Sequence, residues 1–409
     1  MNKKHKLSRC SIIDPDDFWR KNYISNGFST KPLICKNIPS FRIKSLHFAG
    51  NPLETLRFRR LLGKTVILKS HKSKDDFFRN AFINQIQLLS GTHNSLCNFT
   101  NVLKGFPYGI SKLKKYFPTI ISYRIDRSDP TKALYYCMPY YSRKDGWLNG
   151  KEFLETKKSK DEITEFIEKI SYPINIMHSQ TNLEPQSRDY YISRMKNFFN
   201  VISVRLQNDP DLKLYENKTS LIINKLLCRP LKSLNTSICV SIKSDSFWES
   251  VTPKQISLID GDLFLENILY NHHTKSIKLI DVGHIWSLFC GDPIFDREKL
   301  WGSITDELGS IREGRFELNI KSNKINYILH QYSSKCKINK LYIDTPQNFN
   351  CIFKNFMTKD NTNIDARRYL ARSFYAASVL PILKGKNKLI RYFIAVENLN
   401  LALKEFNLL

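Results

Sequence analysis

Three polar side chains in the middle of the sequence have the types and the spacing that phosphate chemistry requires. Asp262 is followed five positions later by Asn267, and Asp281 ends the next apolar run of the chain. Phosphoryl transfer from a nucleoside triphosphate needs a carboxylate that accepts the proton of the attacking hydroxyl, and oxygen ligands that hold Mg²⁺ against the phosphates. We therefore expect Asp262 to be the catalytic base, and Asn267 and Asp281 to be ligands of Mg²⁺ beside ATP.

Two short apolar runs around these residues predict a β-hairpin. Phe264–Tyr270 and Ile277–Ile280 are joined by Asn271–Ser276, a polar segment with the composition of a turn. Because the chain folds back at this turn, Asn267 and Asp281 are expected to approach each other and form one site.

The part of the chain before this hairpin begins with a strand-rich region. Thr65–Ser70 and Leu134–Tyr141 are short, apolar and rich in β-branched or aromatic residues, which predicts strands. Between them, the apolar residues of Lys74–Ser90 recur every three to four positions, which predicts an amphipathic helix.

The remainder is predicted to be mainly helical. Lys160–His178 and Asp189–Gln207 are candidate helices, and the chain is expected to be helical again from Arg297 to its C-terminus. A small strand-rich lobe followed by a larger helical lobe predicts an α+β protein with the two-lobed arrangement of protein kinases.

The site segment also resembles a known family. Its spacing is similar to the catalytic loop and metal motif of protein kinases, and more closely to those of aminoglycoside and choline kinases. Those enzymes read H-G-D-L-x-x-x-N-I-L, I-D-x-G and G-D-P-x-x-D, where this chain reads DGDLFLENILY, LIDVG and GDPIFDREKL. The continuation into GDPIFDREKLWGSI, with a late SVLPIL, resembles kinase-like proteins of bacterial capsule and lipopolysaccharide synthesis. The resemblance is strong over Ile259–Ile304 and weaker, but in the same order, over 60–141 and 365–406.

The resemblance implies a division of the chain and further site residues. It places a kinase-like N-lobe at 41–141 and a helical C-lobe at 142–409 with the catalytic hairpin at 259–283. Residues 1–40, which the resemblance does not cover, are expected to be a separate lead-in. It implies that Lys69 and Met138 bind ATP, at the phosphates and the adenine respectively. It implies a structural role for Asp296 as the anchor of the catalytic loop. The acceptor implied is a hydroxyl of a small molecule, such as a sugar or a cell-surface glycan precursor.

Three departures from the family pattern favour a second hypothesis. Asp260 stands where the family has His, and Gln85 where it has the Glu that pairs with the lysine; no G-x-G-x-x-G occurs, and Gly50–Pro52 is the nearest turn. We expect Asp260 either to raise the pKa of Asp262 or to pair with a Lys or Arg, and Gln85 to bond to Lys69. A catalytically weak pseudokinase or nucleotide-binding scaffold is the alternative to an active kinase.

The net charge of +26 allows a third hypothesis, a basic polyanion-binding protein. The charge is spread along the chain, mostly as Lys, and no nucleic-acid motif accompanies it. We therefore expect the partners to be a nucleotide and a small hydroxylated substrate, with no specific nucleic acid, although the charge allows association with an anionic membrane surface.

The remaining composition predicts a cytoplasmic protein. The nine cysteines are scattered without a C-x-x-C pair, so neither a disulfide framework nor a zinc site is indicated. The sequence contains no run of 18 apolar residues, so no membrane span is predicted. The basic N-terminus lacks the apolar stretch of a secretory signal.

Overall fold

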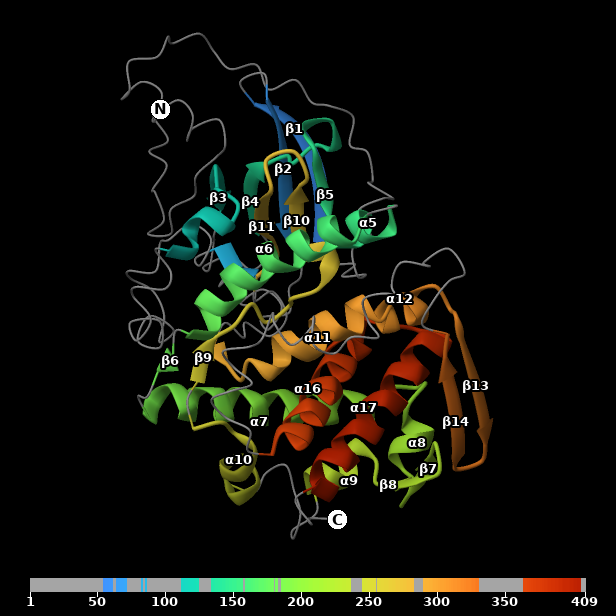
Figure 1. Cartoon of the computed structure of the whole chain (residues 1–409). Coiled ribbons are helices and arrows are strands. Elements are labelled where there is room, and N and C mark those ends of the chain that lie inside the picture. The colour runs from blue at the N-terminus through green and yellow to red at the C-terminus, as the bar shows by residue number, and fades with distance from the viewer. Residues whose placement is uncertain are drawn as a thin grey trace, which may run out of the picture.

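The strand-rich first lobe contains one antiparallel sheet in the order β1-β2-β4-β3 (Figure 1). Its strands are β1 (Glu54–Leu61), β2 (Lys64–His71), β3 (Ser122–Arg124) and β4 (Leu134–Pro139). Both predicted strands are confirmed, but β4 ends before Tyr140, since Pro139 lacks the N–H that continues a ladder. The computed structural model describes residues 54–61, 64–71, 82–83, 85–86, 112–124, 134–156, 159–179, 181–182, 185–236, 245–254, 256–282, 290–330 and 363–405.

A short helical stretch packs on this sheet. Phe82, Ile83 and Ile86 are helical and buried, and they share a hydrophobic cluster with Ile67 of β2 and Met138 of β4. These residues belong to the predicted 74–90 helix, most of which lies outside the described residues. The lead-in at 1–40 and the Gly50–Pro52 turn lie outside them as well.

The second lobe has one large hydrophobic core built mainly from helices. Its longer helices are α6 (Lys160–Ser179), α7 (Pro185–Gln207), α11 (Ile294–Ile304), α16 (Ile364–Ser378) and α17 (Gly385–Glu405). The predicted helices at 160–178 and 189–207 are confirmed as α6 and α7. Figure 1 shows α11, α16 and α17 beside one another in the lower lobe, and α16 and α17 pack along each other extensively.

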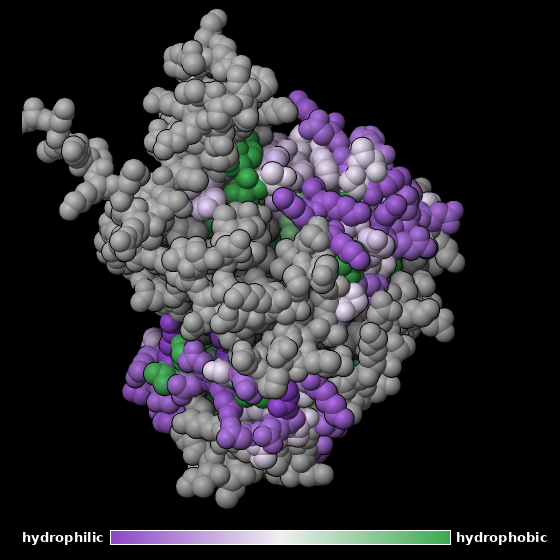
Figure 2. Space-filling view, turned by 90° about the vertical axis from the view of Figure 1, so that its left-hand side faces the viewer, coloured by the Kyte–Doolittle hydropathy of each residue, from purple (hydrophilic) through white to green (hydrophobic). Residues whose placement is uncertain are grey.

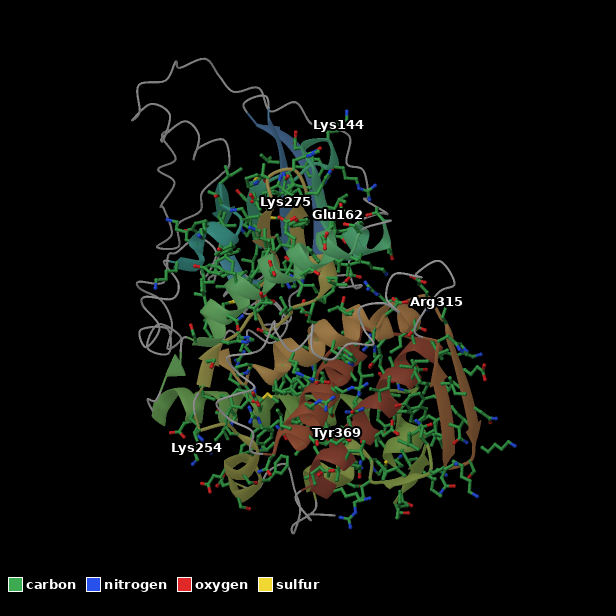
Figure 3. All side chains as sticks on the ribbon, in the orientation of Figure 1. Lys144, Glu162, Lys254, Lys275, Arg315 and Tyr369 are labelled. Carbon is green, nitrogen blue, oxygen red and sulfur yellow. The ribbon has the colours of Figure 1, made fainter. Side chains whose placement is uncertain are left out.

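The predicted catalytic hairpin is present with a shorter first strand. Leu265–Asn267 forms a 3-10 turn (η3), and only then do β10 (Ile268–Asn271) and β11 (Ser276–Leu279) pair antiparallel. A third strand, β5 (Trp147–Asn149), follows the N-lobe directly and pairs with β10. The turn is tied to α6 by an ion pair of 2.8 Å between Lys275, labelled in Figure 3, and Glu165.

The expectation of an all-helical C-terminal part is wrong. β13 (Phe316–Lys321) and β14 (Lys324–Leu329) form an antiparallel hairpin, and β14 also pairs in parallel with β7 (Leu221–Ile223). The reason is a period of two, because apolar Phe316, Leu318 and Ile320 alternate with polar residues along β13. β8 (Leu226–Cys228) completes this sheet.

The smaller elements link these parts. They are η1 (Lys114–Tyr116), η2 (Arg143–Asp145), α5 (Gly150–Glu155), β6 (Thr181–Asn182), α8 (Lys213–Glu216), α9 (Leu231–Thr236), α10 (Asp245–Val251), β9 (Ile256–Leu258), β12 (Cys290–Gly291), α12 (Glu307–Arg312) and η4 (Leu380–Ile382). The predicted α+β, two-lobed kinase-like fold class is therefore confirmed.

Two features of the structure concern contact with a membrane, namely the polarity of its surface and the length and polarity of its helices. Among the described residues of the face in Figure 2, hydrophilic side chains predominate. Within the described part of the chain, every helix is too short or too polar to cross a bilayer.

Candidate active site

The catalytic loop is held in place by Asp296, in the first turn of α11. Its carboxylate accepts hydrogen bonds from the backbone N–H groups of Asp260 and Gly261, both at 2.8 Å. His178, in the last turn of α6, lies 3.0 Å from the same carboxylate through its Nε2 atom. Asp296 thus has the structural role that the family resemblance implies. The sequence analysis did not single out His178, because no local pattern marks it.

A second buried pair fixes the start of α11. Asp292 and Arg367 of α16 form a two-pronged ion pair at 2.6 and 2.7 Å, and their side chains are only 1% and 2% exposed. Asp292 also accepts a hydrogen bond from the backbone N–H of Ile294. This pair therefore joins the α11 N-terminus, and through Asp296 the catalytic loop, to the C-terminal helices.

The Asp262 carboxylate lies between an amide and an ammonium group. The Asn267 Nδ2 atom donates to the Asp262 backbone carbonyl at 3.0 Å and to its Oδ2 atom at 3.3 Å. The Nζ atom of Lys299, from α11, is 2.9 Å from the other carboxylate oxygen. The structure therefore brings Asp262 and Asn267 into direct contact.

Lys299 is a site residue that the sequence analysis missed. Its ammonium group is 5.1 Å from the centre of the Phe264 ring and 4.5 Å from that of Tyr375, so two aromatic faces and one carboxylate surround the charge. The Tyr375 hydroxyl in turn donates to the Gly261 carbonyl. The signal that could have indicated Lys299 is the KL that ends the GDPIFDREKL motif.

Asn267 and Asp281 are neighbours across the catalytic hairpin. The backbone N–H of Ile280 donates to the Asn267 carbonyl at 2.9 Å, which places Asp281 one residue further along. Asp281 has a left-handed backbone with φ of 59°, a conformation that Asp tolerates better than most residues. Since the Asn267 amide nitrogen faces Asp262, its amide oxygen is the atom left to face a cation.

These two donors fit Mg²⁺. Mg²⁺ prefers oxygen ligands, and proteins usually hold it through one or two side chains together with substrate phosphates. Within the described residues, no group of three His, Cys, Asp or Glu side chains is arranged to hold a metal alone. A carboxylate and an amide oxygen that share the ion with a nucleotide match that mode of binding.

Lys69 reaches this hairpin from the N-lobe. Its Nζ atom is 2.7 Å from the Asp281 Oδ1 atom, and its side chain is 1% exposed. In the antiparallel register Lys69 faces Tyr136 and Ile67 faces Met138, so all four lie on one face of the sheet. Met138 is buried in the N-lobe cluster. The structure therefore brings Lys69 and Asp281 together and places Met138 on the lysine's side of the sheet.

Gln85 is buried next to this group, but its described bonds differ from the expected one. Its Nε2 atom donates to the Val282 carbonyl at 3.4 Å, and its Oε1 atom accepts from the Tyr136 hydroxyl at 3.3 Å. The Tyr136 hydroxyl also lies 3.3 Å from Asp281. The hydrogen bond described for Lys69 goes to Asp281, because the carboxylate attracts an ammonium more strongly than a neutral amide does.

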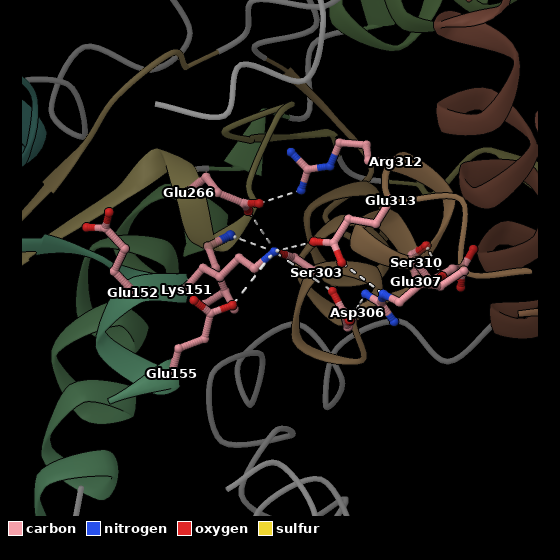
Figure 4. Close-up of polar contacts among 12 residues, drawn as sticks. Lys151, Glu152, Glu155, Glu266, Ser303, Asp306, Glu307, Ser310, Arg312 and Glu313 are labelled. Atoms are coloured by element: carbon pink, nitrogen blue, oxygen red, sulfur yellow. Dashed lines mark hydrogen bonds and ion pairs between the residues drawn. The ribbon is translucent and has the colours of Figure 1, made fainter. Parts of the chain in front are cut away.

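A charged network connects the catalytic loop to α12 (Figure 4). Glu266 accepts from the Ser303 hydroxyl and pairs with Arg312. The Ser303 hydroxyl also accepts from the Leu265 backbone N–H at 3.0 Å. Figure 4 shows Lys151 of α5 among several carboxylates, with Asp306 and Glu313 at 4.0 and 3.9 Å. The loop between Asp262 and Asn267 is thus also held by contacts with α11 and α12.

Asp260 has a buried environment with other carboxylates nearby. It is 1% exposed, it makes no ion pair with a described residue, and its Oδ2 atom has no described hydrogen-bond partner. Its Oδ1 atom accepts from the Asp262 backbone N–H at 3.1 Å. Burial, followed by the nearby Asp296 and Asp262 charges, raises the pKa of Asp260 well above its usual value. The expected pairing with Lys or Arg is wrong, since the neighbouring cation, Lys299, binds Asp262 instead.

Replacement of Asp260 by Asn is expected to stabilise the protein at neutral pH. A carboxyl group whose pKa is raised by folding binds more protons in the folded state, so its contribution to stability falls as pH rises above the unfolded pKa of about 3.9. The neutral amide removes this loss. The measurement is the free energy of unfolding by urea between pH 5 and pH 8, for the parent and for Asp260→Asn.

The control for this prediction is Asp189→Asn on the exposed surface of α7. That variant should keep the parent's pH slope, whereas Asp260→Asn should flatten it. An Asp260→Asn protein that loses stability at pH 8, with an unchanged slope, would show that Asp260 is charged in the folded protein.

No family model matches the sequence, and no curated protein matches it. Solved structures with a similar course of the chain include a protein assigned as an aminoglycoside phosphotransferase from Ralstonia eutropha, with a TM-score of 0.47 and 11% identity over 96% of this chain and 98% of that one. A protein assigned as a fructosamine-3-kinase from Haemophilus somnus has a TM-score of 0.44 and 12% identity, over 92% and 95% of the two chains. Choline kinase from Cryptosporidium parvum has a TM-score of 0.44 and 12% identity, over 96% of each chain. Similarity at this level does not identify a reaction or a substrate.

Proposed function

We propose that the protein is a phosphotransferase that uses ATP and Mg²⁺ to phosphorylate a hydroxyl group of a small molecule. The observation that carries this proposal is the contact between Lys69 of the N-lobe sheet and Asp281 of the catalytic hairpin. Asn267 lies beside Asp281 on the hairpin and is bonded to Asp262. A phosphate-binding cation, two oxygen ligands and a carboxylate base thus form one continuous group, as transfer of a phosphoryl group requires.

Each residue has a distinct task in this proposal. Lys69 would exchange its bond to Asp281 for the nucleotide phosphates. Asp281 and Asn267 would hold Mg²⁺, which would supply positive charge beside those phosphates. Asp262 orients the acceptor hydroxyl and accepts its proton. Lys299 keeps the Asp262 carboxylate in one orientation through the ion pair at 2.9 Å.

The finer assignment concerns the acceptor. The order of motifs from GDPIFDREKL to SVLPIL supports a sugar or a precursor of a cell-surface glycan as the substrate. A nucleotide and a small hydroxylated molecule are the partners in this proposal, and the cytoplasm is where ATP would be supplied.

The positive charge gives less support to a polyanion-binding function. Figure 3 shows Lys254 in the lower lobe, far from Lys144 and Lys275 in the upper one. Lys69 and Lys299, the cations nearest the site, are each committed to a carboxylate. A basic patch that binds nucleic acid needs its cations gathered on one face.

ATP together with Mg²⁺ is expected to raise the melting temperature more than ATP alone. A ligand that binds only the native state stabilises it by mass action, and the ion adds the contacts of Asn267 and Asp281. The measurement is a thermal-shift titration of the full chain with ATP, with and without excess EDTA. Asp281→Ala should abolish the part of the shift that depends on Mg²⁺, whereas Asp189→Ala, on the exposed surface of α7, should retain it.

A screen of sugars for release of ADP then separates an active kinase from a nucleotide-binding scaffold. Equal shifts with and without Mg²⁺ would contradict the metal ligands. A magnesium-dependent shift without ADP release for any acceptor would instead favour the scaffold.

A further inference from the structure

The strand β13 lies at an edge of the sheet formed by β13, β14, β7 and β8. Its one neighbour in this sheet is β14, and no other described strand pairs with it. Figure 1 shows β13 on the outer side of β14, at the margin of the molecule. A strand at a sheet edge can pair with a strand of another chain, because its outward N–H and C=O groups lack partners within the sheet.

The hydrogen-bonding pattern indicates which backbone groups of β13 point to this edge. The His330 backbone N–H donates to the Arg315 carbonyl at 3.0 Å, so these two residues form a hydrogen-bonded pair that continues the β13–β14 register. Hydrogen-bonded and non-hydrogen-bonded pairs alternate along an antiparallel ladder. The residues whose backbone groups point away from β14 are therefore Phe316, Leu318 and Ile320.

The composition of β13 restricts what could pair with this edge. Proteins usually protect an edge strand with a proline, a bulge or a charge. β13 has no proline, and its six residues pair with β14 in an unbroken register. Its charged side chains, Glu317 and Lys321, lie on the exposed face, whereas Leu318 and Ile320 pack against the core. The edge is thus open to a strand that offers the opposite charges at the matching positions.

We propose that β13 pairs antiparallel with β13 of a second copy of this chain, so that the two sheets become one. When Asn319 lies opposite its own copy, Glu317 of each chain faces Lys321 of the other. Leu318 then faces Ile320, so the outward backbone groups of these two residues form the hydrogen-bonded pairs. Two cross-strand pairs of opposite charge stabilise this register on the exposed face.

Neighbouring registers that keep the same faces together are less favourable. A pairing centred on Leu318 would place Lys321 opposite Arg315, which brings two like charges together. A pairing centred on Ile320 would place Lys321 opposite Asn319, without a charge partner. The strand is therefore complementary to itself in the register centred on Asn319. This association does not depend on the proposed reaction.

The first test is sedimentation of the full chain over a range of concentrations, in about 0.15 M salt, which screens the repulsion between two chains of net charge +26. The parent should form a dimer of twice 47.9 kDa. Glu317→Lys and Lys321→Glu should each raise the dimer Kd by about tenfold, because two pairs of opposite charge become two pairs of like charge. The double variant Glu317→Lys, Lys321→Glu exchanges the charges and should restore the parent Kd. Lys386→Glu, in the exposed first turn of α17, should keep the parent Kd as well.

The second test determines the register. Residues opposite each other in a non-hydrogen-bonded antiparallel pair have Cα atoms about 4.5 Å apart, which is within the range of a disulfide. Asn319→Cys should therefore link two chains covalently under mild oxidation, as a dimer band on a non-reducing gel. Asn326→Cys, exposed on the neighbouring β14, and the parent should not form this band.

Several results would overturn the proposal. A parent that stays monomeric at every concentration would exclude the dimer. A dimer Kd that neither charge reversal changes, or that the double variant does not restore, would place the contact elsewhere on the chain. Equal cross-linking of Asn319→Cys and Asn326→Cys would contradict the register.

Discussion

Asp262→Asn is expected to lower turnover by about 10²–10⁴-fold while the protein still binds Mg·ATP. The amide keeps the shape of the side chain and can still contact Lys299 and Asn267, but it cannot accept the proton of an acceptor hydroxyl. The loss should therefore fall on kcat, with little change in the Kd for the nucleotide. Steady-state ADP release with an acceptor measures the first quantity, and calorimetric titration with Mg·ATP measures the second.

The matched control for Asp262→Asn is Asp189→Asn, the same change on the exposed surface of α7. It should leave both quantities unchanged. Loss of Mg·ATP binding in a folded Asp262→Asn protein would show that Asp262 acts in metal binding rather than in the chemical step. That result would refute the roles proposed above.

Arg367→Met should cost about 3–5 kcal/mol of unfolding free energy, because it leaves Asp292 buried without its partner. Both side chains are almost fully enclosed, and the bonds at 2.6 and 2.7 Å are the main compensation for the Asp292 charge. Urea unfolding of the parent and the variant measures this loss. Arg229→Met should change the stability by less than about 0.5 kcal/mol, as surface substitutions usually do.

The double variant Arg367→Met, Asp292→Asn separates the pair from other contacts of Arg367. Removing both charges should recover part of the stability, because no uncompensated carboxylate remains. A double variant that is less stable than Arg367→Met would show that packing of the arginine, rather than its charge, carries the effect.

The sequence could predict those site residues that follow one another along the chain. Asp262, Asn267 and Asp281 lie on one hairpin, and their spacing alone indicates that they meet. Lys69 could be predicted from the family resemblance, which implies a lysine on this strand at the site. The same local patterns gave the two predicted strands and helices α6 and α7, whereas the alternation over Phe316–Lys321 was present but overlooked.

The residues that the sequence could not predict meet the site from distant parts of the chain. Lys299, Tyr375 and His178 reach the catalytic loop through the packing of α11, α16 and α6, and no sequence period encodes which helices become neighbours. Gln85 shows the same limit. Its position beside the site was predicted, but its partners, Tyr136 and Val282, depend on which acceptor lies nearest in space.

The pairing of β5 with β10 has a mechanical consequence. Trp147–Asn149 is hydrogen-bonded into the same sheet as the catalytic hairpin, so the chain becomes part of the C-lobe body almost as soon as it leaves β4. The short segment between Pro139 and Trp147 is then the expected hinge for any rotation of one lobe relative to the other. Lys69 lies in the N-lobe and Asp281 in the C-lobe. Their ion pair at 2.7 Å can therefore form only when the two lobes are close together. A spectroscopic distance measurement between these two positions would report the opening and closing of the lobes directly, without reference to the reaction.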